Sequence, residues 1–506
     1  MTQVSVDHRR FVGYLIIVLL VSTNIFRAYT QSITYDEAVT YNQYVSQGWA
    51  TIFLSWSSNN HAFHSILMKF STDILGSSHV SIRIPALIGG ILYLLAVERL
   101  CRIFCKGRVD YVLSLSALAT SPFILDFLVI ARGYSLALGF LMLSLFLCGS
   151  ILCRTEVAGG RRHLRRTYFL ISCLSALSVA SNLSFAFVNV SLLVVSFSWS
   201  RLLNGLPHGK PYSREEVWQD FKVLVIPGSV LFLLLNPAIL KIDRYELYWG
   251  SQNWSQVYRS LIEALFDDFV KKDLWSIPLE PFMWVVYNLP WLFALCILVG
   301  GIEVLKSVVK SYQTGSILDG NQKLWLFVFA IIAVTMALHS LAYLVLGVLL
   351  PKERTGIFFV SFSMLLAAIS IGTFRRSPLQ SIFRTCGRMS LLFAVIYFLS
   401  SFHWNYFRNW KYDSGSKDIF LALRALKGDY YQKLGIDWLL EPSLNFYRIY
   451  YNDYDFLPFT KNKPHRNQTY FVLLPYVEED RQFIRTHDIK IIYQHPVSKA
   501  IIGVKR

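Results

Sequence analysis

Residues 167–200 read TYFLISCLSALSVASNLSFAFVNVSLLVVSFSWS. It contains no Asp, Glu, Lys or Arg over 34 residues. As a single α-helix it would be about 51 Å long, whereas the hydrocarbon core of a membrane is roughly 30 Å thick. The polar Asn182 lies near its middle and suits a hairpin tip. We therefore predict two antiparallel membrane spans, 167–182 and 184–201.

Other apolar stretches follow the same rule along most of the chain. Of its 506 residues 54% are hydrophobic and 16% are charged, a composition typical of integral membrane proteins. The first stretch has no small-residue cleavage site, so we interpret it as an uncleaved anchor. The predicted fold class is a polytopic α-helical membrane protein. We expect about eleven spans. They lie near 11–27, 80–104, 109–128, 133–153, 167–182, 184–201, 222–240, 282–302, 324–347, 356–373 and 389–404.

The basic residues favour one orientation of these spans. With the N-terminus in the cytoplasm, the inner loops carry clusters such as 161–166, and the short outer turns carry few basic residues. The net charge of +17 is thus an orientation signal and an attraction to anionic lipid, and it does not indicate nucleic-acid binding. All seven cysteines lie in spans or inner loops, which leaves none for an external disulfide or a metal site.

The tail, residues 404–506, falls on the outer side in this topology. Strand-like pieces at 469–474, 489–493 and 500–504 alternate there with helix-like pieces. We predict a transmembrane domain at 1–403, followed by a small extracytoplasmic soluble α/β domain at 404–506.

An acidic pair, Asp36 and Glu37, opens the first outer loop (28–79). Carboxylates this close to lipid are costly to keep, so they are functional candidates by default. The alternative is that they cap a surface helix and interact with its dipole. We expect Asp36 to act as a general base, with Glu37 beside it.

Basic side chains at the same outer face also need an explanation, because charge bias disfavours them there. Arg132, Lys352 and Arg354 are such residues. A lipid-linked phosphate or pyrophosphate would explain them, since a guanidinium group can donate two parallel hydrogen bonds to phosphate oxygens. Membrane-interface anchoring is the alternative for Arg354, and binding of turn carbonyls is the alternative for Arg132. Substrate-binding candidates on this face are Asn60, His61, Asp126, Tyr134 and Trp249.

His61 and His64 lie three residues apart in the first loop. They could share a metal on one helix face, although ordinary hydrogen bonding is commoner for such a pair. The interpretation requires no cofactor, and a divalent metal remains the weaker alternative.

Five short motifs in this order resemble the GT-C glycosyltransferases. The resemblance is closest to the branch with the protein O-mannosyltransferases and the lipid A aminoarabinose transferase, and it covers about the first 360 residues. The tail matches nothing in it. The motifs are Tyr35-Asp36-Glu37, Asn59-Asn60-His61, Arg83-Ile84-Pro85, Ala131-Arg132-Gly133-Tyr134 and Glu353-Arg354-Thr355.

The resemblance implies that the transmembrane domain, residues 1–403, is GT-C-like, and that the protein transfers a sugar from a polyprenyl-phosphate donor at the outer leaflet. It implies that Asp36 is the catalytic base, that Arg354 binds the donor phosphate and that Arg132 is a second candidate for that role. The aminoarabinose transferase has a Lys-Pro-Pro motif in its first loop, where this chain has Asn59-Asn60-His61. His61 is therefore the candidate to replace that lysine.

Several alternatives stay open at this point. A retaining mechanism would need a nucleophilic carboxylate, for which Glu37 and Asp126 qualify. A flippase or transporter for lipid-linked glycans would also be polytopic and basic, but it should carry its ionisable residues near the middle of the membrane. A non-catalytic assembly factor would not need Asp36. The expected setting is a bacterial inner membrane with the site facing the periplasm, and the expected acceptor is an envelope glycan or glycolipid of the lipopolysaccharide or O-antigen type.

Overall fold

The chain is mostly helical in the computed structural model, as predicted. The structure describes residues 2–153, 160–204, 213–241, 246, 249–266, 280–374, 378–426, 434–454, 456, 458–460 and 468–505. The α-helices are α1 (Thr2–Thr30), α2 (Tyr35–Thr40), α3 (Trp49–Leu54), α4 (Ala62–Leu75), α5 (His79–Phe104), α6 (Arg108–Thr120), α7 (Pro122–Phe127), α8 (Tyr134–Leu152), α9 (Gly160–Ser181), α10 (Ala186–Asn204), α11 (Arg214–Leu235), α12 (Trp254–Phe266), α13 (Glu280–Thr314), α14 (Gly320–Leu346), α15 (Ile357–Thr373), α16 (Pro378–Ser400), α17 (Ser416–Ala425), α18 (Glu441–Tyr450) and α19 (Glu478–Thr486). Shorter turns are η1 (Tyr41–Val45), η2 (Leu183–Phe185), η3 (Pro237–Lys241), η7 (Glu353–Gly356) and η8 (Arg408–Gly415), and the strands are β1 (Leu434–Ile436), β2 (Tyr470–Leu473), β3 (Ile489–Gln494) and β4 (Ile501–Lys505).

Eight helices in the described part of the chain are long and apolar enough to cross a membrane. Helices α6, α9 and α10 occupy the three other expected spans. Between α9 and α10 the side-chain oxygen of Asn182 accepts the N–H of Ser184 at 3.0 Å and caps η2. The hairpin predicted within 167–200 is therefore confirmed. The eight spanning helices are α1, α5, α8, α11, α13, α14, α15 with η7, and α16.

The expected span 109–128 is corrected in one detail, because it divides into α6 and α7 at Ser121–Pro122. Proline has no N–H and its ring clashes with the carbonyl one turn earlier, so a helix ends before it and a new one starts with it. The short α7 thereby carries Asp126 and Phe127 to the end of the bundle that holds the first loop.

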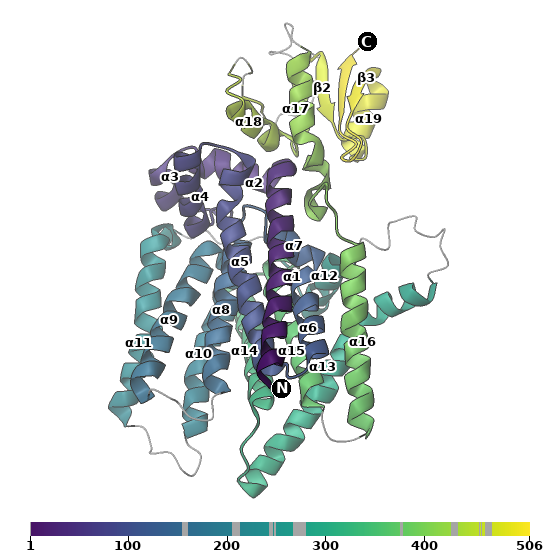
Figure 1. Cartoon of the computed structure of the whole chain (residues 1–506). Coiled ribbons are helices and arrows are strands. Elements are labelled where there is room, and N and C mark those ends of the chain that lie inside the picture. Colours follow the sequence, from purple (N-terminus) through teal and green to yellow (C-terminus); the bar gives the residue numbers. More distant parts are fainter. Residues whose placement is uncertain are drawn as a thin grey trace.

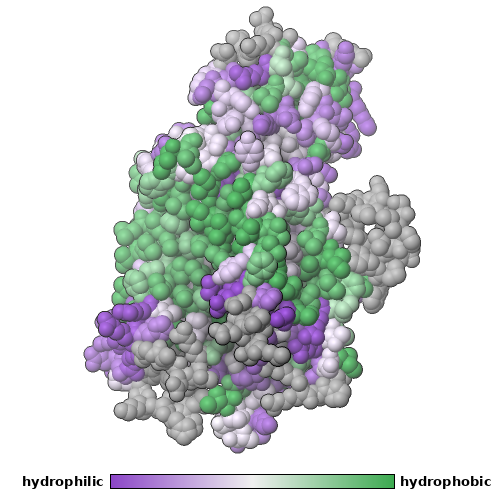
Figure 2. Space-filling model, viewed as in Figure 1, coloured by the Kyte–Doolittle hydropathy of each residue, from purple (hydrophilic) through white to green (hydrophobic). Residues whose placement is uncertain are grey.

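Helices α5, α8 and α15 form the centre of the bundle. The apolar window of α15 is 83% buried inside the protein, whereas that of α11 is 17% buried. An added Cβ at Gly89 of α5 would overlap the backbone of Leu136 in α8, so these helices approach each other closely at a small residue. The peripheral helices expose apolar side chains, and Figure 2 shows these as a hydrophobic band between two hydrophilic ends. Such a band matches a lipid-facing surface.

The tail carries one four-stranded sheet of order β1-β2-β4-β3. Strand β1 pairs parallel with β2, while β2 and β3 both pair antiparallel with β4. Strands β2, β3 and β4 lie at the predicted places. Strand β1 was not predicted, because Leu434-Gly435-Ile436 is too short to show an alternating pattern. The small α/β unit is confirmed, while a domain boundary near residue 403 remains a prediction.

The tail and the first loop lie at the same end of the bundle, opposite the N-terminus (Figure 1), and we call this the outer end. They share one hydrophobic core, which includes Ile33 and Tyr41 of the first loop and Phe446 and Tyr447 of α18. The rings of Tyr41 and Phe446 are 5.4 Å apart, and the Tyr447 hydroxyl accepts the N–H of Ile33 at 3.0 Å. The tail is therefore packed onto the loop that carries the acidic pair.

Candidate active site

The acidic pair lies in the first turn of α2, where a capping box fixes it. The Thr34 hydroxyl accepts the N–H of Glu37 at 3.3 Å, and the Glu37 carboxylate accepts the N–H of Thr34 at 2.9 Å. Both carboxylates are buried, with Asp36 8% exposed and Glu37 not exposed at all. The capping role is therefore carried by Glu37.

Glu37 has both carboxylate oxygens occupied. Arg83 of α5 donates Nε to Oε1 at 2.8 Å and Nη2 to Oε2 at 2.7 Å, and the N–H of Ala131 donates to Oε1 at 2.7 Å. Burial raises the pKa of Glu37, but the Arg83 charge and these hydrogen bonds outweigh it and hold the pKa below its usual range. This carboxylate thus ties together α2, α5 and the turn before α8.

Asp36 pairs with a different arginine, Arg354. Arg354 donates Nη1 to Asp36 Oδ2 at 2.7 Å. Burial raises the pKa of Asp36, but the charges of Arg132 and Arg354 and the hydrogen bond from Arg354 lower it below its usual range. Asp36 is therefore an ionised carboxylate at neutral pH.

Arg354 is carried by η7, between α14 and α15. Its neighbour Glu353 has a φ of 46°, a left-handed backbone conformation that is uncommon outside glycine. The Glu353 N–H donates to the hydroxyl of Ser260 in α12 at 3.1 Å and helps to hold this turn. The guanidinium carbon of Arg354 lies 5.7 Å from the centre of the Trp410 ring. Backbone strain of this kind gathers at functional sites.

Arg132 lies in the turn that precedes α8. It donates to the Thr40 hydroxyl at 3.3 Å and to the Asn59 side-chain oxygen at 3.1 Å, and its buried Nε has no hydrogen-bond partner among the described residues. Gly133 follows with a φ of 24°, and an added Cβ there would overlap the carbonyl of Ser181. Only glycine fits this turn, which brings Arg132 next to Asp36.

Two buried histidines adjoin Arg132. His61 Nε2 and both ring nitrogens of His64 have no hydrogen-bond partner among the described residues. Burial and the Arg132 charge lower the pKa of His61 well below its usual value and that of His64 to about 3, so both rings are neutral at pH 7. The His61 ring lies edge-on to Tyr134 at 5.8 Å. In the described part of the chain no group of three or more potential ligands could hold a metal ion.

Other predicted residues are engaged elsewhere. The Asn60 amide donates to the carbonyls of Ile52 and Ser55 and so closes the first loop. Asp126 pairs with Arg27, and its second oxygen accepts the N–H of Arg408 at 2.9 Å. These contacts are structural, and neither residue joins the Asp36 group in this structure.

Lys352 and Trp249 form a separate contact at the outer end. The Lys352 ammonium lies 4.6 Å from the centre of the Trp249 ring, which is half exposed. Such a cation over an aromatic face is a favourable pair at an exposed rim. The structure thus places both predicted residues together at the edge of the site rather than on Asp36.

Three residues of this region were not predicted as site residues. Arg83 appears in a quoted motif, but nothing in the sequence indicates its pairing with Glu37. Arg27 lies in the first span, where a buried charge signals a partner without naming it. Trp410 comes from the tail and lies against the Arg354 guanidinium, and no local pattern connects the two.

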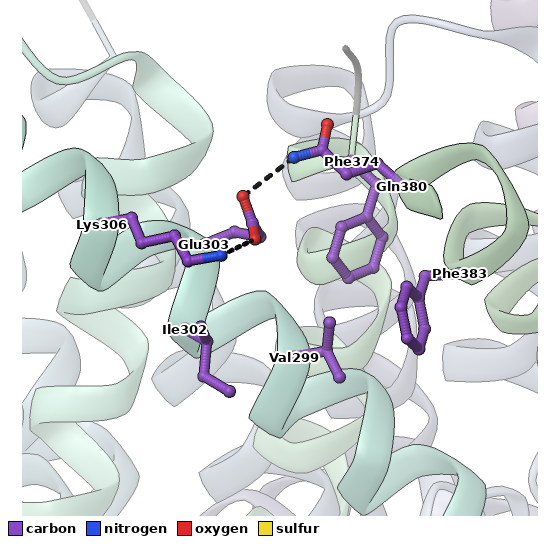
Figure 3. A pocket seen from close by; sticks show the side chains of 7 residues that line it. All are labelled: Val299, Ile302, Glu303, Lys306, Phe374, Gln380 and Phe383. Carbon is purple, nitrogen blue, oxygen red and sulfur yellow. Dashed lines mark hydrogen bonds and ion pairs between the residues drawn. The ribbon is translucent and has the colours of Figure 1, made fainter. Parts of the chain in front are cut away.

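A cavity of about 330 Å³ lies away from this site, near the inner end of α13 and α16 (Figure 3). Its carboxylate, Glu303, accepts hydrogen bonds from Lys306 at 2.8 Å and from Gln380 at 2.9 Å. Its polar groups are thus paired with one another. The lining residues are Val299, Ile302, Glu303, Lys306, Phe374, Gln380 and Phe383.

No family model and no curated protein matches the chain. Similar solved structures include ArnT from Cupriavidus metallidurans bound to undecaprenyl phosphate, with a TM-score of 0.43 and 12% identity over 97% of both chains. The archaeal oligosaccharyltransferase AglB from Archaeoglobus fulgidus, in complex with an inhibitory peptide and a dolichol-phosphate, has a TM-score of 0.41 and 11% identity over 90% of this chain and 60% of its own.

Proposed function

We propose that this protein is a membrane glycosyltransferase that moves a sugar from a polyprenyl-phosphate donor to an envelope glycan or glycolipid, with Asp36 as general base. One observation carries the proposal: a buried, ionised carboxylate lies within hydrogen-bonding distance of Arg354 and beside Arg132, at the outer end of a membrane-spanning bundle. A base and two cations are the groups that such a transfer needs, because a phosphate leaving group requires charge stabilisation and no general acid.

The charges of the site suit a phosphodiester. Glu37 is paired with Arg83 and Asp126 with Arg27, so these two ion pairs are neutral. Asp36 is paired with Arg354, while Arg132 has only the neutral partners Thr40 and Asn59 among the described residues. The group of Asp36, Arg354 and Arg132 therefore carries one net positive charge. The single negative charge of a sugar phosphodiester would compensate it.

The reaction then takes one displacement. The acceptor hydroxyl transfers its proton to the Asp36 carboxylate as its oxygen bonds to the anomeric carbon. The bond from that carbon to the phosphate oxygen breaks, and the polyprenyl phosphate leaves with the electron pair. Arg354 and Arg132 stabilise the charge that gathers on the leaving oxygen. The anomeric configuration inverts.

Donor binding also prepares the base. In the empty site the charges of Arg132 and Arg354 hold the Asp36 pKa low, which makes it a weak proton acceptor. A bound phosphate compensates the same two guanidinium groups and weakens their attraction for the carboxylate. The Asp36 pKa rises as a result, towards the range in which a carboxylate takes a proton.

Two observations favour this reaction over the alternatives. A retaining reaction needs a carboxylate that can attack the sugar, yet Glu37 and Asp126 have both oxygens occupied by donors. A flippase should keep its ionisable groups near the middle of the bundle, whereas this group lies at the outer end. Donor and acceptor identities follow the sequence resemblance: a polyprenyl-phosphate sugar, and a lipopolysaccharide or O-antigen glycan at the periplasmic face of a bacterial inner membrane.

The test is transfer by purified protein in detergent, where no membrane sides exist and transport cannot be counted as activity. The chain is incubated with radiolabelled polyprenyl-phosphate sugars and envelope lipid extract. Asp36→Asn should fold normally and lose transfer by about 10²–10⁴-fold, because an amide cannot accept the proton. Asp73→Asn, at an aspartate of α4 that pairs with Lys69, is the matched control and should be unaffected. Full activity in Asp36→Asn would overturn the base assignment.

A further inference from the structure

Three segments meet at Gly133, in the turn that carries Arg132. An added Cβ at Gly133 would overlap the carbonyl of Ser181, at the end of α9, and would lie 3.1 Å from the Cβ of His61 in the first loop. Asn182 follows Ser181 and caps η2, and η2 lies beside η7, the turn that carries Arg354. The first loop, the Gly133 turn and the hairpin tip at Asn182 are therefore neighbours of the candidate site.

The buried side chains of this meeting point keep polar atoms that no described residue contacts. His61 is 5% exposed, Asn182 is 3% exposed and His64 is not exposed. His64 lies one turn from His61 at the start of α4, so the two rings lie on the same face of that helix. Buried polar atoms are costly unless they are hydrogen-bonded. The atoms without a hydrogen-bond partner among the described residues are His61 Nε2, His64 Nδ1 and Nε2, Asn182 Nδ2 and Arg132 Nε.

These atoms suit a neutral ligand that is rich in hydroxyl groups. A hydroxyl both donates and accepts, so it can bond an amide or guanidinium N–H as well as either nitrogen of a neutral imidazole. Burial and the Arg132 charge lower the pKa of His61 and that of His64, which keeps both rings neutral. A neutral imidazole cannot replace the positive charge of a lysine. His61 is therefore better suited to a sugar hydroxyl than to a phosphate.

The charge of the site also restricts the sugar. The group of Asp36, Arg354 and Arg132 carries one net positive charge, which one phosphodiester compensates. An amino group on the sugar would add a buried positive charge, and a carboxylate would add a negative one. Neither would find a counter-charge among the neutral side chains of His61 and Asn182, and a buried unpaired charge is costly.

We propose that His61, His64 and Asn182 bind the hydroxyl groups of the donor's sugar ring, and that this sugar is neutral. The inference rests on the proposed function, which places the donor phosphate at Arg132 and Arg354. The sugar is bonded directly to that phosphate, so its ring lies beside the groups that hold the phosphate. The three side chains are thus specificity-determining residues, and Arg132 Nε is the point where the phosphate and sugar contacts meet.

Competition between donor analogues tests the charge of the sugar. Radiolabelled polyprenyl phosphate is bound to the purified protein in detergent and displaced by short-chain prenyl phosphodiesters. These carry a methyl group, a neutral hexose or pentose, the matching amino sugar or the matching uronic acid. At least one neutral sugar should bind about tenfold more tightly than the methyl diester, and about tenfold more tightly than its amino and acidic counterparts. A charged sugar that binds as tightly as its neutral counterpart, or no gain over the methyl diester, would overturn the proposal.

Substitutions test the side chains. His61→Phe keeps a ring beside Tyr134 and removes both nitrogens. It should weaken the neutral-sugar diester about three- to tenfold and leave the methyl diester unchanged. His79→Phe is the matched control, because His79 is also buried with an unpartnered Nε2 among the described residues but lies under the tail. If His61→Phe does not fold, Asn182→Ser keeps an oxygen for the η2 cap, removes the amide donor and should give the same pattern. An unchanged preference for the sugar in the variant that folds would contradict the proposal.

The outcomes separate this proposal from the proposed function. If the wild type prefers neutral-sugar diesters through His61 and transfers no sugar, the sugar subsite stands and the glycosyltransferase assignment fails. If the wild type transfers sugar while His61→Phe and Asn182→Ser keep its donor preference, the proposed function stands and the subsite fails.

Discussion

Arg132 and Arg354 differ in what neutralises them, and this difference organises the site at the scale of single residues. Arg354 has a carboxylate partner in Asp36, whereas Arg132 contacts a hydroxyl and an amide oxygen. A buried guanidinium that keeps an unpaired Nε is expensive unless a ligand completes it. Arg132 is therefore suited to make the first contact with an anion such as the donor phosphate. Arg354 is suited to contact that anion later, as Asp36 takes up a proton and its ion pair with Arg354 weakens.

Substitution of Arg354 tests its share of phosphate binding. Arg354→Lys keeps the charge but loses the planar pair of donors, and it should weaken donor use. Arg354→Ala should lose roughly 2–4 kcal/mol of transition-state stabilisation, read from kcat/KM for the donor. Arg259→Ala, at an exposed arginine of α12, is the control. Near-normal turnover in Arg354→Ala would leave this residue as an interfacial anchor.

Substitution of Glu37 should act on folding rather than on chemistry. Glu37→Gln leaves the fully buried guanidinium of Arg83 without its counter-charge, at a cost of roughly 3–5 kcal/mol. The expected result is a lower thermal unfolding temperature in detergent. The protein that remains folded should turn over substrate at close to the wild-type rate. The double variant Glu37→Gln/Arg83→Met should recover part of the stability. A Glu37→Gln protein of normal stability and lost turnover would instead give Glu37 a catalytic role.

At the scale of elements, the sequence predicts what local pattern encodes. The length of the uncharged stretches located the spans and the Asn182 hairpin. The alternation of apolar and polar residues located β2, β3 and β4. Basic and acidic residues on one membrane face pointed to a group made of Asp36, Arg132 and Arg354. Pairings between positions far apart in the chain, such as Glu37 with Arg83 (46 residues apart) or Tyr35 with Asp413 (378 residues apart), depend on tertiary packing, and neither propensity nor periodicity encodes them.

The tail should become less stable as pH rises from about 4 to 7. Asp437 and Asp480 hydrogen-bond each other, and burial together with the Asp437 charge raises the pKa of Asp480 to about 7 from a usual 3.8. The folded tail thus holds a proton that the unfolded chain releases, so stability falls with pH between about 4 and 7 and then levels off. Hydrogen exchange of β2 and β4 in the full chain should show more protection near pH 5 than near pH 8.

The pH effect has its own controls. Asp480→Asn should flatten the dependence, because an amide can donate to Asp437 at every pH. Asp488→Asn, at an exposed aspartate beside β3, should keep it. If hydrogen-exchange protection in Asp480→Asn still falls with pH as in the wild type, the prediction that Asp437 and Asp480 share a proton is wrong.

At the scale of the whole molecule, the two ends of the bundle differ in what they hold. The outer end holds the Asp36 group, the first loop and the tail (Figure 1). The inner end holds charges that are bonded to one another, such as Asp110 with Arg384 and Arg388. The side of the membrane that each end faces is predicted from the basic inner loops, with the tail in the periplasm.

Cysteine labelling tests this orientation. In a cysteine-free background, Gln482→Cys on the exposed face of α19 should react with a membrane-impermeant maleimide in intact cells. Gln313→Cys, exposed near the end of α13, should react only after permeabilisation. The reverse pattern would invert the topology and place the site in the cytoplasm.

The bond between Tyr35 and Asp413 joins positions 378 residues apart, and this has a consequence for how the protein is made. The ribosome delivers the acidic pair early, whereas Trp410 and the core that covers the first loop emerge only after every span has been threaded into the membrane. A nascent chain can therefore hold Asp36 at the surface for the whole of its insertion without an organised site. We expect that chains stalled or cleaved before residue 404 insert but have no activity, and that supplying the missing part as a separate polypeptide restores it. Activity would then begin only once translation has passed this point.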